Sequence, residues 1–177
     1  MAGVRRTGLL ILGWALVASA CASTGATPKP FPMPHAAPAS STERDTPQPP
    51  SATIVATSIV GSALDLRGSP YRNGGTDPAG FDCSGFTRYV FGRFGLELPR
   101  EVEDQFRVGR RVARREIAPG DLVFFSTVAR GASHVAIAIG GDQFIHAPSS
   151  RGVVRVEHLN SDYWRSRFVG IRRVLPE

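Results

Sequence analysis

Apolar residues recur at helical intervals in the region that begins at residue 54. Between residues 54 and 66 they form one stripe of an amphipathic helix, which Gly68 and Pro70 end. A second helix is predicted over Cys83–Phe94, because Asp82 is a favourable capping residue before it. The apolar stripe of this helix consists of Phe86, Val90 and Phe94, and Gly95 follows its end.

Beyond Pro119-Gly120 the pattern changes to the alternation that is typical of strands. Five strands are predicted, over Asp121–Ser126, His134–Ile139, Gln143–Ala147, Val153–Leu159 and Phe168–Val174. A glycine-rich loop is expected over Tyr71–Phe81, and a short helix is expected to begin near Arg100 or Glu101. Helices first and antiparallel strands second indicate an α+β fold, with N-terminal helices packed on a sheet of about five strands.

The N-terminal residues have the pattern of an export signal. Arg5 and Arg6 precede the apolar run Leu9–Val17, which is too short to span a bilayer. Residues 1–20 are therefore predicted to be a signal peptide. The small residues before Cys21 look like a bacterial lipobox, so we expect Cys21 to be lipidated. Ordinary secretory cleavage after residue 20 is the alternative.

Residues 21–53 differ in composition from the rest of the chain. Eight of the 14 prolines lie here, and most of the other residues are Ala, Ser and Thr. Such a segment favours extended polyproline conformations and forms no core, so we predict a tether. A proline-rich ligand for a partner domain is the alternative. Residues 54–177 then form one domain.

Composition narrows the class of protein. With 42% hydrophobic and 20% charged residues, the chain of 177 residues is not wholly disordered. Its two cysteines exclude a disulfide-dense scaffold and a multi-cysteine zinc module. The net charge is +6, but Lys29 is the one lysine and no basic tract is dense enough for a nucleic-acid arm. We expect neither a nucleic-acid partner nor a cofactor.

Cys83 is the first candidate for chemistry. It lies at a predicted helix N-terminus, where unpaired backbone N–H groups and the helix dipole favour a thiolate. The thiolate is the nucleophilic form of cysteine, so a catalytic cysteine is expected at such a place. The alternative is a buried, inert cysteine.

Two histidines could assist this cysteine. A cysteine nucleophile needs a base, and the base needs an orienting partner. His134 begins one strand of a predicted hairpin and His146 lies on the other. Structural histidines are the alternative, and His35 and His158 are assigned no role.

The hairpin register decides whether these two histidines meet. A two-residue loop that pairs Gly140 with Gln143 places them on opposite faces. We predict a three-residue loop that pairs Ile139 with Gln143, with a glycine in the left-handed region, so that both histidines face the cysteine helix. Two small residues on that face, Ala136 and Ala138, would let the helix pack closely.

Several motifs in this order resemble the NlpC-like cell-wall cysteine endopeptidases. Ser69-Pro70-Tyr71-Arg72-Asn73-Gly74-Gly75 and Phe81-Asp82-Cys83-Ser84-Gly85-Phe86 resemble the nucleophile region. The resemblance continues through Leu98-Pro99-Arg100, Pro119-Gly120-Asp121-Leu122-Val123-Phe124-Phe125, His134-Val135-Ala136-Ile137 and Phe144-Ile145-His146-Ala147-Pro148. It covers essentially all of residues 54–177.

The resemblance implies a papain-like α+β fold and hydrolysis of peptidoglycan peptides through a thioester. By position, Cys83 corresponds to the nucleophile, His134 to the general base and acid, and His146 to the residue that orients His134. Peptidoglycan is then the expected partner, together with the membrane through the lipid on Cys21. The protein is expected in the cell envelope, anchored and facing the periplasm, or else secreted.

The resemblance also implies substrate contacts. Tyr71 would lie near the thiol and contact substrate or the oxyanion. Asp82 and Ser84 match positions that help some members to bind the stem peptide, and Arg100 matches an arginine often found in the family, where it could meet substrate carboxylates. The typical cleaved bond joins γ-D-glutamate to a diamino acid, while some members cut cross-links.

Three alternative functions use the same residues. An acyltransferase or amidase would share the Cys83–His134 dyad, with an amine or alcohol resolving the thioester. A non-catalytic envelope-binding lipoprotein would keep the fold without the activity. A metal site would use Cys83, His134 and His146 as ligands, although the chain lacks the close-spaced ligand pairs of common zinc sites.

Overall fold

Helix α1 (Ala52–Asp65) is the first element of the computed structural model, which describes residues 51–148 and 152–175. The Ser51 hydroxyl caps it by accepting a hydrogen bond from the Ile54 N–H (3.5 Å), so the helix begins slightly before the predicted one. The predicted signal peptide, Cys21 and nearly all of the predicted tether lie outside the described residues. Within them, no helix has the length and apolar character needed to cross a membrane.

Helix α2 (Cys83–Gly92) has the cysteine at its first residue. The Asp82 carboxylate caps it, as predicted, by accepting a hydrogen bond from the Gly85 N–H at 2.7 Å. The helix ends earlier than the predicted Phe94, because the chain tightens into turns and reaches Gly95 in the left-handed region (φ 73°).

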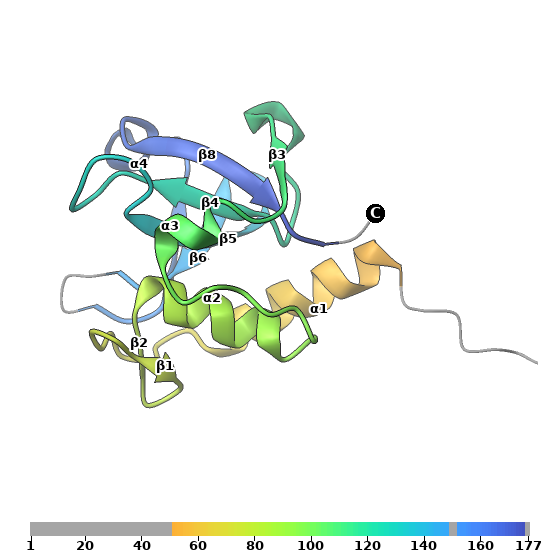
Figure 1. The fold of residues 1–177 in the computed structure, drawn as a ribbon, viewed down its shortest axis with the longest axis vertical. Helices are drawn as coiled ribbons and strands as arrows, with labels where there is room; N and C mark the ends of the chain where they lie inside the picture. The colour runs from red at the N-terminus through yellow and green to blue at the C-terminus, as the bar shows by residue number, and fades with distance from the viewer. Residues whose placement is uncertain (1–50, 149–151, 176–177) are drawn as a thin grey trace, which may run out of the picture. The chain divides into compact units, whose positions relative to one another are not determined.

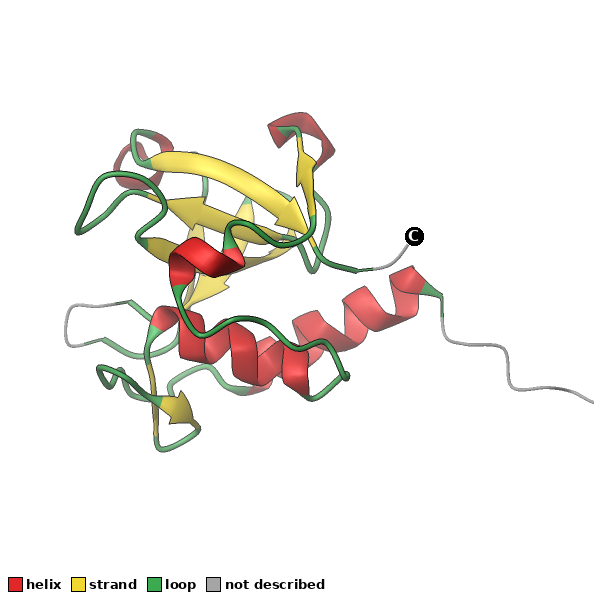
Figure 2. Ribbon diagram, in the orientation of Figure 1, coloured by secondary structure: helices red, strands yellow, loops and turns green. Residues whose placement is uncertain are grey.

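The predicted antiparallel sheet is present and has six strands rather than about five. Their order is β3-β8-β4-β5-β6-β7. The sheet lies above helices α1 and α2 in the view of Figures 1 and 2. Their bounds are Arg110–Val112 (β3), Leu122–Phe125 (β4), His134–Gly140 (β5), Gln143–His146 (β6), Arg155–His158 (β7) and Phe168–Arg173 (β8). The short helices are α3 (Val102–Gln105), α4 (Asp162–Arg165) and a 3-10 turn, η1 (Arg114–Glu116).

The strands that the sequence analysis did not predict are short. β3 consists of two arginines and a valine, so it shows no alternation to recognise. A hairpin of β1 (Thr76–Asp77) and β2 (Gly80–Phe81) lies within the predicted glycine-rich loop. The α+β order of helices and strands is confirmed.

The two faces of the sheet are both covered, and helices α1 and α2 lie on one of them (Figure 1). The core on the helix face includes Val135, Ile137, Ile145 and Ala147, together with Phe86 and Val90 of α2. The opposite face has a second core with Trp164 of α4, which includes Ala136, Ala138, Phe144 and Phe125. The prediction that Ala136 and Ala138 receive the cysteine helix is therefore wrong, because the larger β-branched side chains of β5 face α2.

The β5–β6 hairpin has the predicted strand register but a different loop. Gly140 pairs with Gln143, so the connection has two residues, and a register shift at Ile139 then restores the pairing of Ala138 with Phe144. Gly140 (φ 115°) and Gly141 (φ 59°) are both in the left-handed region, as expected. The bulge changes the loop that we predicted but keeps His134 and His146 on a common face. This is the face that carries Ala136 and Trp164 and not the face that α2 covers, so the prediction that both histidines face the cysteine helix is wrong.

Gly85 packs closely against the loop that precedes α2. A Cβ at this position would lie 2.0 Å from the carbonyl oxygen of Gly75, so the backbone of the loop would have to move. We expect Gly85→Ala to lower the free energy of unfolding by about 1–3 kcal/mol in urea titrations. Gly92→Ala in the same helix is the matched control, because nothing lies within 4 Å of its Cβ. Equal stability of the two variants would contradict this packing.

Candidate active site

The thiol of Cys83 lies where the start of α2 meets the start of β5. The backbone N–H of Val135 lowers the pKa of the thiol, and the backbone N–H groups of Ser84 and Cys83 act in the same direction. Val135 directly follows His134, so the fold brings the thiol to the segment that carries this histidine. Cys83 is half-buried, which leaves part of the residue exposed to solvent.

His134 and His146 form a buried pair. His134 is the first residue of β5 and His146 is the last of β6, and the distance from His134 Nε2 to His146 Nδ1 is 2.7 Å. Their exposed fractions are 2% and 0%. The indole of Trp164 stacks on His134 (centroid distance 5.6 Å) and meets the His146 ring edge-on (5.0 Å), which restricts both ring planes.

The bond between the rings links their protonation. A neutral imidazole carries one N–H, so a ring that donates through one nitrogen accepts through the other. When His134 donates from Nε2, its Nδ1 is the unprotonated nitrogen that can take a proton from a thiol. His146 then accepts on Nδ1 and carries its own proton on Nε2.

Burial opposes the thiolate that the helix N-terminus was expected to favour. Burial raises the pKa of the Cys83 thiol, and the N–H of Val135 offsets this only in part. Burial also lowers the pKa of His134 to about 3, with a further contribution from His146. Both shifts favour the neutral thiol and the neutral imidazole over their charged forms.

Glu157, Arg155 and Trp164 surround the histidine pair and were not singled out from the sequence. A pocket of about 280 Å³ lies beside His134, and Cys83 is not among the residues that line it. Its walls are Thr127, His134, Pro148, Arg155, Glu157, Tyr163 and Trp164. No sequence signal marked Glu157, which appears as an ordinary polar residue of a strand.

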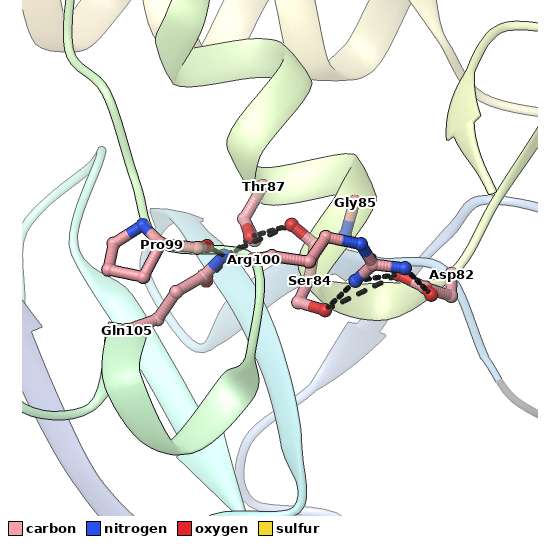
Figure 3. A network of polar contacts seen from close by, with 7 residues as sticks. All are labelled: Asp82, Ser84, Gly85, Thr87, Pro99, Arg100 and Gln105. Carbon is pink, nitrogen blue, oxygen red and sulfur yellow. Dashed lines mark hydrogen bonds and ion pairs between the residues drawn. The ribbon is translucent and has the colours of Figure 1, made fainter. Parts of the chain in front are cut away.

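Arg100, Asp82 and Ser84 form a polar network at the start of α2 (Figure 3). The Arg100 guanidinium forms an ion pair with the Asp82 carboxylate and donates to the Ser84 hydroxyl at 2.7 Å. The predicted substrate-binding residues thus bind one another. Asp82 already accepts from Arg100 and from the Gly85 N–H.

Buried Gln105 extends this network, as Figure 3 shows. Its amide donates to the carbonyl oxygens of Pro99 (2.8 Å) and Ser84 (3.1 Å), and its carbonyl accepts from the Thr87 hydroxyl (2.7 Å). These bonds tie the segment that carries Arg100 to the helix that carries Cys83. A polar residue in a four-residue helix gives no sequence signal for such a role.

Tyr71 and Cys83 both pack against the core on the helix face of the sheet. Burial raises the pKa of the Tyr71 phenol, and the negative charges of Cys83 and Asp82 add to this shift, whereas Arg100 opposes it. These four side chains therefore share one electrostatic environment. Their contacts with a substrate remain predictions.

The metal-site alternative has no geometric support in the described part of the chain. Within residues 51–148 and 152–175, no group of three or more His, Cys, Asp or Glu side chains is arranged to hold a metal ion. Cys83, His134 and His146 are thus not placed as a ligand set there.

Comparison with known proteins places this geometry in a family. The sequence pattern of the NlpC/P60 family matches residues 68–173, which is more than half of the chain. The chain belongs to the NlpC/P60 family. The resemblance drawn from the sequence motifs is confirmed, and so is the papain-like α+β fold.

Two curated relatives and one solved structure show how far the similarity extends. The chain is 46% identical to the gamma-DL-glutamyl hydrolase of Bacillus subtilis (strain 168), over 65% of this chain and 28% of that protein. It is 43% identical to the murein DD-endopeptidase MepS/murein LD-carboxypeptidase of Escherichia coli (strain K12), over 66% of this chain and 62% of that protein. The crystal structure of an NlpC/P60 family protein of Bacillus cereus ATCC 10987 matches with 34% sequence identity and a TM-score of 0.65. The match covers 73% of this chain and 42% of that one. The chain thus spans less than two thirds of the length of each of these proteins.

Proposed function

We propose that this NlpC/P60 domain is a cysteine peptidase that hydrolyses an amide bond in the stem peptides or cross-links of peptidoglycan. The observation that carries the proposal is the thiol of Cys83 at the head of α2, next to the β5 segment that holds the His134–His146 pair. The names of the relatives, which include a murein endopeptidase and a γ-glutamyl hydrolase, support this substrate class.

The proposed reaction starts from the neutral pair. His134 removes the proton of the Cys83 thiol through Nδ1, and the sulfur attacks the amide carbonyl. Backbone N–H groups at the start of α2, including that of Cys83, are proposed to stabilise the oxyanion. Losing one such donor costs about 10²–10³-fold in rate.

The second half of the reaction returns the enzyme to its starting state. His134 gives its proton to the amide nitrogen, the C–N bond breaks and the amine leaves, so that the acyl group remains on sulfur as a thioester. Water then attacks the thioester with His134 as the base, which releases the carboxylic acid and restores the thiol. In this scheme His146 keeps Nδ1 of His134 directed at the sulfur.

The remaining substrate and location proposals follow the family resemblance. Tyr71 is proposed to contact substrate next to the thiol, and Arg100, with Asp82 and Ser84, is proposed to form the nearby wall of the substrate site. We place the protein in the cell envelope, because relatives are named as murein enzymes. A lipid on Cys21 is the proposed anchor, with residues 1–20 as its signal peptide and residues 21–53 as the tether.

Digestion of whole peptidoglycan tests the activity and identifies the bond. Purified protein is incubated with sacculi, and the released fragments are identified by mass spectrometry. We expect fragments that carry one new carboxyl group and one new amino group at a stem-peptide or cross-link amide. Digestion that cuts only glycan linkages, or no release at all, would contradict the proposal.

A further inference from the structure

One buried nitrogen of the histidine pair has no hydrogen-bond partner in the described structure. This atom is Nε2 of His146, which must carry a proton when Nδ1 accepts from His134. A buried N–H without an acceptor is costly. The carboxylate oxygen Oε1 of Glu157 faces it at 3.6 Å, slightly beyond hydrogen-bond distance.

The position of Glu157 is fixed by its own partners. Strand β7 pairs with β6 so that Arg155 lies opposite His146, and Glu157 follows two residues later on the same strand face. Arg155 Nε donates to Oε1 of Glu157 at 2.6 Å, and the Trp164 indole N–H donates to Oε2. Trp164 also stacks on His134, so one side chain contacts both His134 and Glu157.

We infer that Glu157 is a positioning residue of the active site, the fourth member of a relay that runs from Cys83 through His134 and His146. This inference rests on the proposed function. Glu157 fixes the proton of His146 on Nε2, which keeps Nδ1 of His146 as the acceptor for His134. It also stabilises the positive charge that the pair acquires when His134 takes the thiol proton.

The charges around the pair fit this role. Glu157 is ionised at neutral pH, because His146 beside it and hydrogen bonds from Trp164 and Arg155 lower its pKa to about 2. Its charge raises the pKa of both histidines against the opposing effect of burial, while Arg155 lowers that of His146. Among the described residues, Arg155, Glu157 and Tyr163 are the other titratable or charged side chains that line the pocket beside His134. The 3.6 Å contact shortens when the pair becomes charged, since catalytic hydrogen bonds are often long in the resting enzyme.

Glu157→Gln tests the inference, because glutamine keeps the size of the side chain and an acceptor for Trp164 but removes the charge. General acid–base catalysis supplies about 10²–10⁴-fold, and we expect this variant to lose about 10-fold or more in kcat with little change in KM. The acid limb of the pH profile of kcat/KM is expected to shift to lower pH. Glu157→Asp, which restores the charge, is expected to return the limb toward its original position.

Arg155→Gln is the matched control, because it is expected to shift the acid limb in the opposite direction. It removes the positive charge that lowers the pKa of His146, while the Trp164 indole still holds the Glu157 carboxylate, so the acid limb should move to higher pH. A role of Glu157 that is merely structural would change stability without moving the limb in opposite directions in these two variants.

A readout without substrate separates this inference from the proposed function. In ¹⁵N NMR of labelled histidines, we expect His146 to be protonated on Nε2 in the unmodified protein, and the titration of the pair to shift to lower pH in Glu157→Gln. Unchanged ring tautomers and titration in that variant, or an acid limb that does not move, would overturn the inference. Activity that survives Cys83→Ala would instead overturn the proposed function and leave the NMR result standing.

Discussion

Cys83→Ala protein is expected to lose at least about 10⁴-fold of its activity on peptidoglycan, since removal of a nucleophile eliminates covalent catalysis. The substitution removes one sulfur atom from a half-buried position, so the fold should be retained. The measurement is the rate of fragment release from sacculi by liquid chromatography and mass spectrometry. Circular dichroism and the melting temperature establish that the variant is folded.

Cys21→Ala is the matched control for this loss. It removes the other cysteine of the chain, which lies outside the described domain, and should leave the hydrolytic rate of the soluble protein unchanged. A Cys83→Ala variant that digests peptidoglycan at a rate close to that of the unmodified protein would contradict the nucleophile assignment.

The free energy of unfolding is expected to fall steeply as the pH drops below about 6.5. His134 has an ordinary pKa of 6.5 in the unfolded chain and a pKa of about 3 when buried in the fold. Between these values the unfolded state binds the proton that the folded state excludes, so stability is lost at up to about 1.4 kcal/mol per pH unit for this group. His146, whose pKa is also lowered by burial, adds a loss of the same sign.

Glu157 extends the loss of stability to lower pH. Its pKa is about 2 in the fold against an ordinary 4.5, so its stabilising contribution is complete above the ordinary value and disappears as the pH falls toward 2. Urea titrations from about pH 7 to about pH 4 measure the combined slope. A flat profile over this range would show that the histidine pair is not held neutral in the fold.

The helices and most strands follow from local patterns in the sequence. The capping carboxylate of Asp82 and the stripe of Phe86 and Val90 are local features, so they predict the start and the buried side of α2. Alternation predicts β4 to β8 in the same way, with ends that differ by one or two residues. The three-residue β3 has too few residues for any period to appear.

The orientation of β5 shows what alternation leaves open. Both sides of this strand are apolar, with Val135 and Ile137 on one face and Ala136 and Ala138 on the other. The pattern determines which residues share a face, and therefore that His134 and His146 can meet, but it does not determine which face receives the helix. That choice depends on how β-branched residues pack against α2, which is a tertiary effect.

Glu157 and the protonation of the site required the three-dimensional structure. Glu157 comes to His146 through the pairing of β7 with β6, and the sequence gives no sign of that register. The helix N-terminus marked Cys83 as a candidate nucleophile, yet the burial that raises the pKa of its thiol arises from packing against β5. Local sequence thus indicated the candidate nucleophile, whereas the rise in the pKa of its thiol comes from tertiary packing.

Selective alkylation of Cys83 tests its role as nucleophile most directly. In a Cys21→Ser background, the protein is treated with iodoacetamide, and intact-mass and peptide analysis give the fraction of Cys83 modified at each time. We predict that hydrolytic activity falls in direct proportion to the unmodified fraction, that a stem-peptide substrate protects the thiol, and that alkylation accelerates with rising pH. Full activity in protein whose Cys83 is completely alkylated would contradict the cysteine-peptidase mechanism.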